Sequence, residues 1–251
     1  MKKIVCTAAL ALVATMGAYA GGQTAEPAAA SDWTGGHIGM NVGGTWQRGI
    51  TTFDENFTTF AMREDTLAVK QGGAVAGAEL GYDWQLGEKT VIGVETDFDW
   101  SGLRGTHTDG STLANTTPGI LSTTQKITWF GTVRPIFGFL PLHNWLLYVT
   151  GGFAYGHIKD NADTDFRETG GTLHYPGSRE ATQCGWTAGA GGKWKFHKNW
   201  SANLLYLYYD LNEGQAFSLP APSTNPPNFV RYRWTSNANV IRLGMDYHFS
   251  A

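Results

Sequence analysis

Hydrophobic and polar residues alternate one by one over long stretches of this chain. From residue 73 to 86, alanines, leucines and aromatics occupy the even positions; glycine, valine, glutamine and acidic residues occupy the odd ones. The segment from 91 to 100 repeats this pattern. A period of two predicts β-strands, because successive side chains of a strand point to opposite faces. Gly87, Glu88 and Lys89 lie between the two segments and predict a tight turn.

The same alternation recurs in six further segments. They cover residues 37–46, 127–138, 147–156, 186–196, 200–209 and 241–249. Each is near or above the roughly 9–11 residues that a tilted strand needs to cross a membrane. The pattern therefore predicts eight strands.

The connectors between these strands alternate in length. Short connectors fall at 87–89, 140–144 and 197–199, and long polar ones at 47–71, 101–125, 159–182 and 212–235. We expect the long connectors to be loops; residues 218–228 contain four prolines, which suits an exposed, irregular loop. Long loops at one end and both termini at the other are typical of outer-membrane barrels. The predicted fold is all-β: an eight-stranded antiparallel up-and-down transmembrane β-barrel.

Aromatic residues gather at both ends of the predicted strands, and two aromatic girdles are what the two interfaces of a bilayer favour. Alternation alone does not say which face is inside. A soluble, lipocalin-like carrier would turn the apolar face inward and stays an alternative. The predicted girdle residues are Trp46, Trp84, Trp100, Trp129, Trp145, Trp186, Trp194, Trp200, Tyr247 and Phe249.

The N-terminus has the features of an export signal. Lys2 and Lys3 precede an apolar stretch, Ile4–Met16, and Ala18-Tyr19-Ala20 matches a cleavage site. We predict a signal peptide over residues 1–20, cleaved after Ala20, a flexible periplasmic lead-in over 21–32, and the barrel over 33–251. No later run of 18 or more apolar residues follows, which excludes a helical membrane protein. A membrane-embedded chain must then be a closed barrel, because lipid cannot satisfy open backbone groups.

Composition supports this assignment. The chain has 33 glycines, 13% aromatic residues and only 16% charged residues, an unusual combination for a soluble domain. Its 18 Lys and Arg are balanced by 21 Asp and Glu, which argues against nucleic-acid binding. We expect the protein in the outer membrane of a Gram-negative bacterium, in contact with lipid, lipopolysaccharide and the outer-membrane assembly machinery.

The polar face of the strands carries charges of both signs. Inside an eight-stranded barrel, which is about wide enough for side chains to fill it, isolated charges would be costly. Opposite charges can pair and remain ionised, so we predict a packed network that plugs the lumen. Its predicted members are Glu79, Glu95, Asp97, Arg134, Lys193 and Arg242.

Several segments carry a family resemblance. They include Trp33-Thr34-Gly35, Asn41-Val42-Gly43-Gly44, the stretches 127–134, 147–156 and 199–211, and the ending 241–249. Together they resemble the small outer-membrane immunogenic or surface-antigen (porin-like) proteins, which are similar to the membrane domain of the outer-membrane protein A type. The resemblance covers nearly all of the mature chain. It implies an eight-stranded barrel with a mainly structural or surface role.

Catalysis and metal binding receive little support from the sequence. The rim residues Asp97, Asp99, His107 and His157 form no recognisable triad, and no set of histidines, cysteines and carboxylates closes a tetrahedral site. We therefore expect that the protein is not an enzyme and binds no metal ion or cofactor. The leading hypothesis is a structural barrel that contributes to envelope integrity. A narrow channel for small solutes, and a module that binds a host or phage ligand through its loops, stay open as alternatives.

Overall fold

A computed structural model describes residues 32–57, 60–109, 112–113, 117–168, 171–218 and 229–249. The predicted signal peptide, its cleavage after Ala20 and all but the last residue of the lead-in lie outside these residues. They stay predictions.

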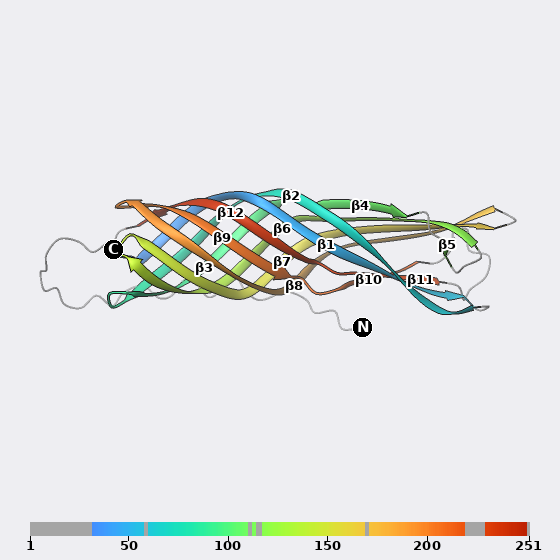
Figure 1. The fold of residues 1–251 in the computed structure, drawn as a ribbon, viewed down its shortest axis with the longest axis horizontal. Coiled ribbons are helices and arrows are strands. Elements are labelled where there is room, and N and C mark those ends of the chain that lie inside the picture. The colour runs from blue at the N-terminus through green and yellow to red at the C-terminus, as the bar shows by residue number, and fades with distance from the viewer. Residues whose placement is uncertain are drawn as a thin grey trace, which may run out of the picture.

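Eight strands form a closed antiparallel ring, which confirms the predicted architecture (Figure 1). Each strand pairs with its neighbours in chain order, and the first strand pairs with the last over residues 37–46 and 239–248. Within the described strands of the ring, this closure leaves no open sheet edge for lipid to contact. The strands are β1 (Gly35–Phe57), β2 (Phe60–Leu86), β3 (Thr90–Ser101), β6 (Thr117–Leu142), β7 (Trp145–Glu168), β8 (Gly171–His197), β9 (Trp200–Asp210) and β12 (Asn237–His248).

All three predicted short turns are present, between β2 and β3, β6 and β7, and β8 and β9. The prediction of long loops, in contrast, is wrong for most of their length. Strands β1, β2, β6, β7 and β8 continue through these polar stretches, and β7 alone has 24 residues. Four shorter strands lie at the same end of the molecule (Figure 1): β4 (Arg104–Asp109), β5 (Thr112–Leu113), β10 (Gly214–Ser218) and β11 (Phe229–Trp234). Of the proline-rich stretch 218–228, only Ser218 is described.

The strands continue because they enclose a second apolar core outside the membrane region. Tyr232 packs edge-on against Phe53 and stacks on Trp234, with ring centroids 5.5 and 5.8 Å apart. We call this part of the barrel the outer extension. Its buried core consists of Phe53, Leu67, Leu121, Ala162, Tyr175, Val230, Tyr232 and Trp234. Burial of these side chains stabilises strand pairing where polar composition alone suggested loops.

The two halves of the barrel have opposite polarity. Near the short turns, apolar side chains face outward: Met40 is 71% exposed and Val42 62%, whereas their inward neighbour Asn41 is buried. An apolar exterior is stable in lipid, so the lipocalin-like alternative is wrong for this half. In the outer extension the apolar side chains face inward, as in a soluble barrel. Among the described residues, no helix is long and apolar enough to cross a membrane.

Candidate functional site

The lumen of the membrane half holds a cluster of charged side chains, and three of its acids come from one strand. Glu95, Asp97 and Asp99 occupy alternate positions of β3, so all three point inward. The side chains of Val94 and Phe98, on the opposite face of the strand, point toward lipid, and this fixes the register of the strand. The strand therefore presents a column of three carboxyl groups to the interior.

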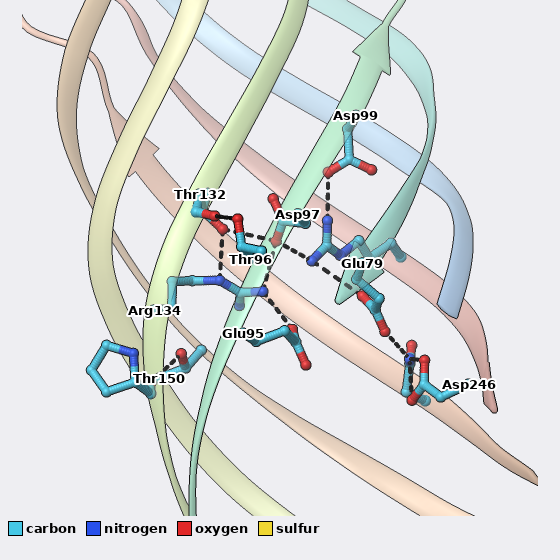
Figure 2. A network of polar contacts seen from close by, with 12 residues as sticks. Glu79, Glu95, Thr96, Asp97, Asp99, Thr132, Arg134, Thr150 and Asp246 are labelled. Atoms are coloured by element: carbon cyan, nitrogen blue, oxygen red, sulfur yellow. Dashed lines mark hydrogen bonds and ion pairs between the residues drawn. The ribbon is translucent and has the colours of Figure 1, made fainter. Parts of the chain in front are cut away.

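Arg134 binds two acids of this column, Glu95 and Asp97. It lies on β6, where it is the direct cross-strand partner of Glu95 on β3. Its Nη2 lies 2.7 Å from Glu95 Oε1 and 2.7 Å from Asp97 Oδ2, and its Nε donates to Thr132 Oγ1 at 2.7 Å (Figure 2). Thr132 in turn donates to Asp97 Oδ2 at 2.8 Å. The guanidinium is thus held by charge-assisted hydrogen bonds in a fixed orientation.

Arg242 reaches the same column from β12. Its Nη1 lies 2.5 Å from Asp99 Oδ2 and its Nη2 2.6 Å from Asp97 Oδ2. Its Nη2 also lies 3.5 Å from Glu79 Oε2 on β2. One guanidinium therefore links the last strand to the second and third. The long side chain has room to cross because its cross-strand partner is Gly43.

Lys193 completes the cluster from β8. Its Nζ lies 2.9 Å from Glu95 Oε2, 3.0 Å from His37 Nε2 and 3.6 Å from Asp246 Oδ2. The other ring nitrogen of His37 lies 3.4 Å from Asp83. The contacts of Lys193 extend the cluster toward the short-turn end.

The structure brings all six residues predicted for the network together. None is more than 3% exposed. Further residues of the lumen join the six: His37, Asp83, Asp99, Thr132, Asn203 and Asp246. Their place on the polar face of the alternation was the available signal for most of them. Asn203 donates to Glu79 at 2.6 Å and to Asp246 at 2.9 Å, so an amide bridges two acids.

Apolar side chains close the lumen on either side of the charges. Toward the short turns, Trp33 is 1% exposed and donates its indole N–H to the carbonyl of His143 at 3.2 Å. Lys195 Nζ lies 4.4 Å from the Trp33 ring centroid. Toward the outer extension, Phe130 stacks on Tyr209 at 5.0 Å. Trp33 precedes the first strand, and no periodic pattern marked it as a plug.

The ten predicted girdle residues lie on the outside of the barrel, at the ends of the membrane half. Nine are more than a third exposed, from Trp84 and Tyr247 at 37% to Trp100 at 64%. Trp129 is partly covered because it stacks on Phe98 and His157. At the short-turn end Trp145 stacks on Trp194, with ring centroids 5.8 Å apart.

The residues considered for catalysis are separated. Asp97 and Asp99 bind arginines deep in the lumen rather than lying at the rim. His157 lies on the outer surface with its Nε2 3.0 Å from Glu180 Oε1. His107 is an exposed residue of β4, in the outer extension. Their positions provide no shared site for a nucleophile and a base.

One group of metal-ligand residues lies on the surface of the outer extension. Ligand atoms of Asp163, Asp165 and His174 come within 4.8 Å of one another. The three side chains are wholly or partly exposed, and His174 Nδ1 lies 2.5 Å from Asp165 Oδ1. The group therefore already forms a surface ion pair when His174 is protonated.

Comparisons with known proteins agree with this geometry. The family model for the outer membrane protein beta-barrel domain matches residues 6–249. The "31 kDa outer-membrane immunogenic protein" of Brucella melitensis is 31% identical over 259 residues, covering 99% of this chain and 100% of that protein. The "22 kDa outer membrane protein" of Rhizobium leguminosarum is 30% identical over 141 residues, covering 53% of this chain and 54% of that protein.

The solved structures that this chain matches share little sequence with it. The outer membrane protein OprG of Pseudomonas aeruginosa is 15% identical and has a TM-score of 0.48, over 88% of this chain and 99% of that one. The family-model match and the full-length relative decide the assignment. This chain belongs to the outer membrane protein beta-barrel domain family and is a protein of the outer membrane.

Proposed function

We propose that this chain is a non-enzymatic structural barrel that contributes to envelope integrity and does not conduct solutes. One observation carries the proposal: three cations of the lumen, Arg134, Arg242 and Lys193, are fully buried among their partners, each 0% exposed. Water and ions passing through the barrel would have to contact these groups. The apolar side chains of Trp33 and of the Phe130–Tyr209 pair lie in series with them.

Electrical recording tests the closed lumen. Full-length refolded protein is added to planar lipid bilayers, and insertion is verified by its heat-modifiable gel mobility in liposomes of the same lipid. We expect no stable stepwise currents. Reproducible large steps from the folded protein would instead favour the narrow-channel alternative.

A deletion strain tests the structural role. We expect loss of the protein to increase sensitivity to bile salts, and an intact copy to restore resistance. A copy with Arg134→Ala that assembles poorly should restore less. Unchanged resistance in the deletion strain would contradict a role in envelope integrity.

A second candidate function, ligand binding at the outer surface, is favoured by the outer extension. Its packed core holds β7 and β8 in register as far as Glu168 and Gly171, so its outer face is a preformed surface. Binding sites usually lie on segments that a rigid scaffold positions. Exchange of exposed residues such as Asn161 and Ser178 for lysine should then reduce adhesion to cells without changing the heat-modifiable mobility. Unchanged adhesion by a well-folded variant would count against this candidate.

A further inference from the structure

A band of basic side chains surrounds part of the barrel just beyond the aromatic girdle. Arg48 and Lys70 are direct cross-strand partners on β1 and β2. Arg104 on β4 pairs with Lys126 on β6, and Lys126 pairs in turn with Lys159 on β7. We call these five residues the cationic belt.

All five side chains point away from the barrel. Their neighbours in the chain, such as Gln47, Leu103 and Gln125, are buried inside, whereas Arg48, Lys70, Arg104 and Lys126 are exposed. Lys159 is partly exposed. The belt therefore faces whatever surrounds the barrel at this level.

The belt lies at the depth of the outer-leaflet headgroups. Arg48 is two residues beyond the girdle residue Trp46 on the same face of β1. Lys126 lies just beyond Trp129, and Arg104 follows Trp100 after a short break in the strand. Aromatic girdles mark the interface between hydrocarbon and headgroups, so the next outward residues contact the headgroups themselves.

Pairs of like charge in direct register are destabilising unless an anion lies between them. Lys159 binds Glu180 through a 2.6 Å ion pair. Within the described part of the chain, Arg48, Lys70, Arg104 and Lys126 form no ion pair with the protein. Strand spacing of about 4.8 Å places each basic pair so that one phosphate group could contact both members.

The belt is also confined to one sector. At a similar level, the outward positions of the strands that follow β7 in the ring include two acids: Glu180 on β8, which pairs with Lys159, and Asp210 on β9. A uniform ring of positive charge would attract the barrel to any anionic membrane surface. A one-sided cluster of two like-charged pairs instead favours a bound molecule with more than one phosphate.

We propose that the cationic belt is a binding site for phosphorylated lipid headgroups of the outer leaflet, with the chemistry of the phosphorylated lipid A portion of lipopolysaccharide. Arg48 with Lys70, and Arg104 with Lys126, each hold one phosphate by charge-assisted hydrogen bonds. The acyl chains of the bound lipid then lie along the apolar exterior of β1, β2 and β6. This site is independent of whether the lumen conducts.

The test uses the full protein in phosphatidylcholine nanodiscs that contain increasing fractions of bis-phosphorylated lipid A. The melting temperature, followed by tryptophan fluorescence, reports binding. We expect it to rise with lipid A in the wild-type protein. The variant Arg48→Gln/Lys70→Gln should need roughly 25-fold more lipid A for half the rise, as expected for the loss of two membrane-facing cations.

The matched control is Lys89→Gln/Lys198→Gln, which removes two exposed lysines from the short turns at the opposite rim. It should respond as the wild-type protein does. Fully dephosphorylated lipid A should raise the melting temperature far less. If a double variant fails to fold, Lys126→Gln alone is measured, and a several-fold loss is expected.

Three results would overturn the proposal. One is an equal response from the belt variants and the wild-type protein. Another is an equal rise with dephosphorylated lipid A, which would assign the effect to acyl chains. The third is the same rise with inorganic phosphate in nanodiscs without lipid A, which would show a site for free anions instead of lipid headgroups.

Discussion

At the scale of single residues, glycines decide where long charged side chains can cross the lumen. A Cβ atom on Gly43 would lie 2.1 Å from the carbonyl oxygen of Ile241 and 2.7 Å from the Cα of Arg242. Both atoms belong to backbone, which cannot move aside cheaply. Its neighbour Gly44 faces outward, and a Cβ there would meet nothing within 4 Å. Adjacent glycines of one strand thus have different structural roles.

We predict that Gly43→Ala lowers the stability of the barrel by about 1–3 kcal/mol, as overpacking usually does. Gly44→Ala should change it little, since the added methyl group enters open space. Urea-induced unfolding in detergent, followed by gel mobility, measures both. Equal stability of the two variants would show that the strand can shift to admit a methyl group at Gly43.

The ion pairs of Arg134 support a second prediction at this scale. Removing one partner of a buried pair leaves the other charge uncompensated, which typically costs about 3–5 kcal/mol. Arg134→Ala should therefore destabilise the barrel by this order, because Glu95 and Asp97 both lose a donor. The same unfolding assay applies, with Arg48→Ala as an exposed control. A loss no larger than that of the control would contradict the network's role in stability.

At the scale of elements, the strands change polarity where they leave the membrane. On β11, Val230, Tyr232 and Trp234 face the interior, and Arg231 and Arg233 alternate with them. The hydroxyl of Tyr232 donates to the carbonyl oxygen of Tyr175 at 2.6 Å and lies within hydrogen-bond distance of Thr164 Oγ1, at 2.9 Å. Its ring and its hydroxyl together connect β11 to β1, β7 and β8. The outer extension is thus stabilised separately from the charged lumen.

We predict that Tyr232→Ala loosens the outer extension while leaving the membrane half intact. Loss of a buried aromatic side chain costs about 3–5 kcal/mol, and here the cost falls on one region. Limited proteolysis should cut the extension, while the protected core keeps its heat-modifiable mobility. Ile50→Ala, at a position 42% exposed, is the control. Loss of the whole barrel would mean that the two halves fold as one unit.

The same extension contains a buried carboxyl group that responds to pH. Asp160 is 2% exposed, and burial raises its pKa to about 7, although Arg179 across the strand pair opposes the rise. A raised pKa means that the protonated form is favoured in the folded state. The stabilisation is full below the unfolded pKa of about 4 and is lost as pH rises through about 7.

Asp160→Asn should therefore remove this pH dependence. In the wild-type protein, the free energy of unfolding of the extension should fall between pH 5 and 8, by at most roughly 4 kcal/mol, and its melting temperature should fall with it. The asparagine variant should show a flatter profile and be the more stable at pH 8. Asp109→Asn, an exposed carboxyl, should follow the wild-type profile. Parallel profiles for the wild-type protein and Asp160→Asn would refute the assignment.

Much of this element structure could be predicted from the sequence, because strand alternation and short turns are local. Glu79, Glu95 and Arg242 were assigned to the lumen by their position in the alternation alone. Their distances depend on how far neighbouring strands are staggered, which no single segment encodes. The outer extension was missed because its outward face is polar, although Val230, Tyr232 and Trp234 show the same period of two.

At the scale of the whole molecule, the lumen is closed by layers in series. The charged network lies between Trp33 on one side and the stacked Phe130 and Tyr209 on the other, and the core of the outer extension lies beyond. We therefore expect that no single layer is needed for closure. Phe130→Ala/Tyr209→Ala should accordingly remain non-conducting in planar bilayers. Stable currents from this variant would show that the aromatic pair alone closes the barrel.

The contacts of Arg242 also constrain the order of assembly. This residue comes from the last strand of the ring and binds acids of the second and third strands. Before β12 joins β1, Asp99 lacks this partner, and Asp97 and Glu79 are only partly compensated. A half-inserted sheet would expose these carboxylates to lipid. Stepwise insertion of single strands is therefore unfavourable, and charge neutralisation and closure of the seam become one late, cooperative event.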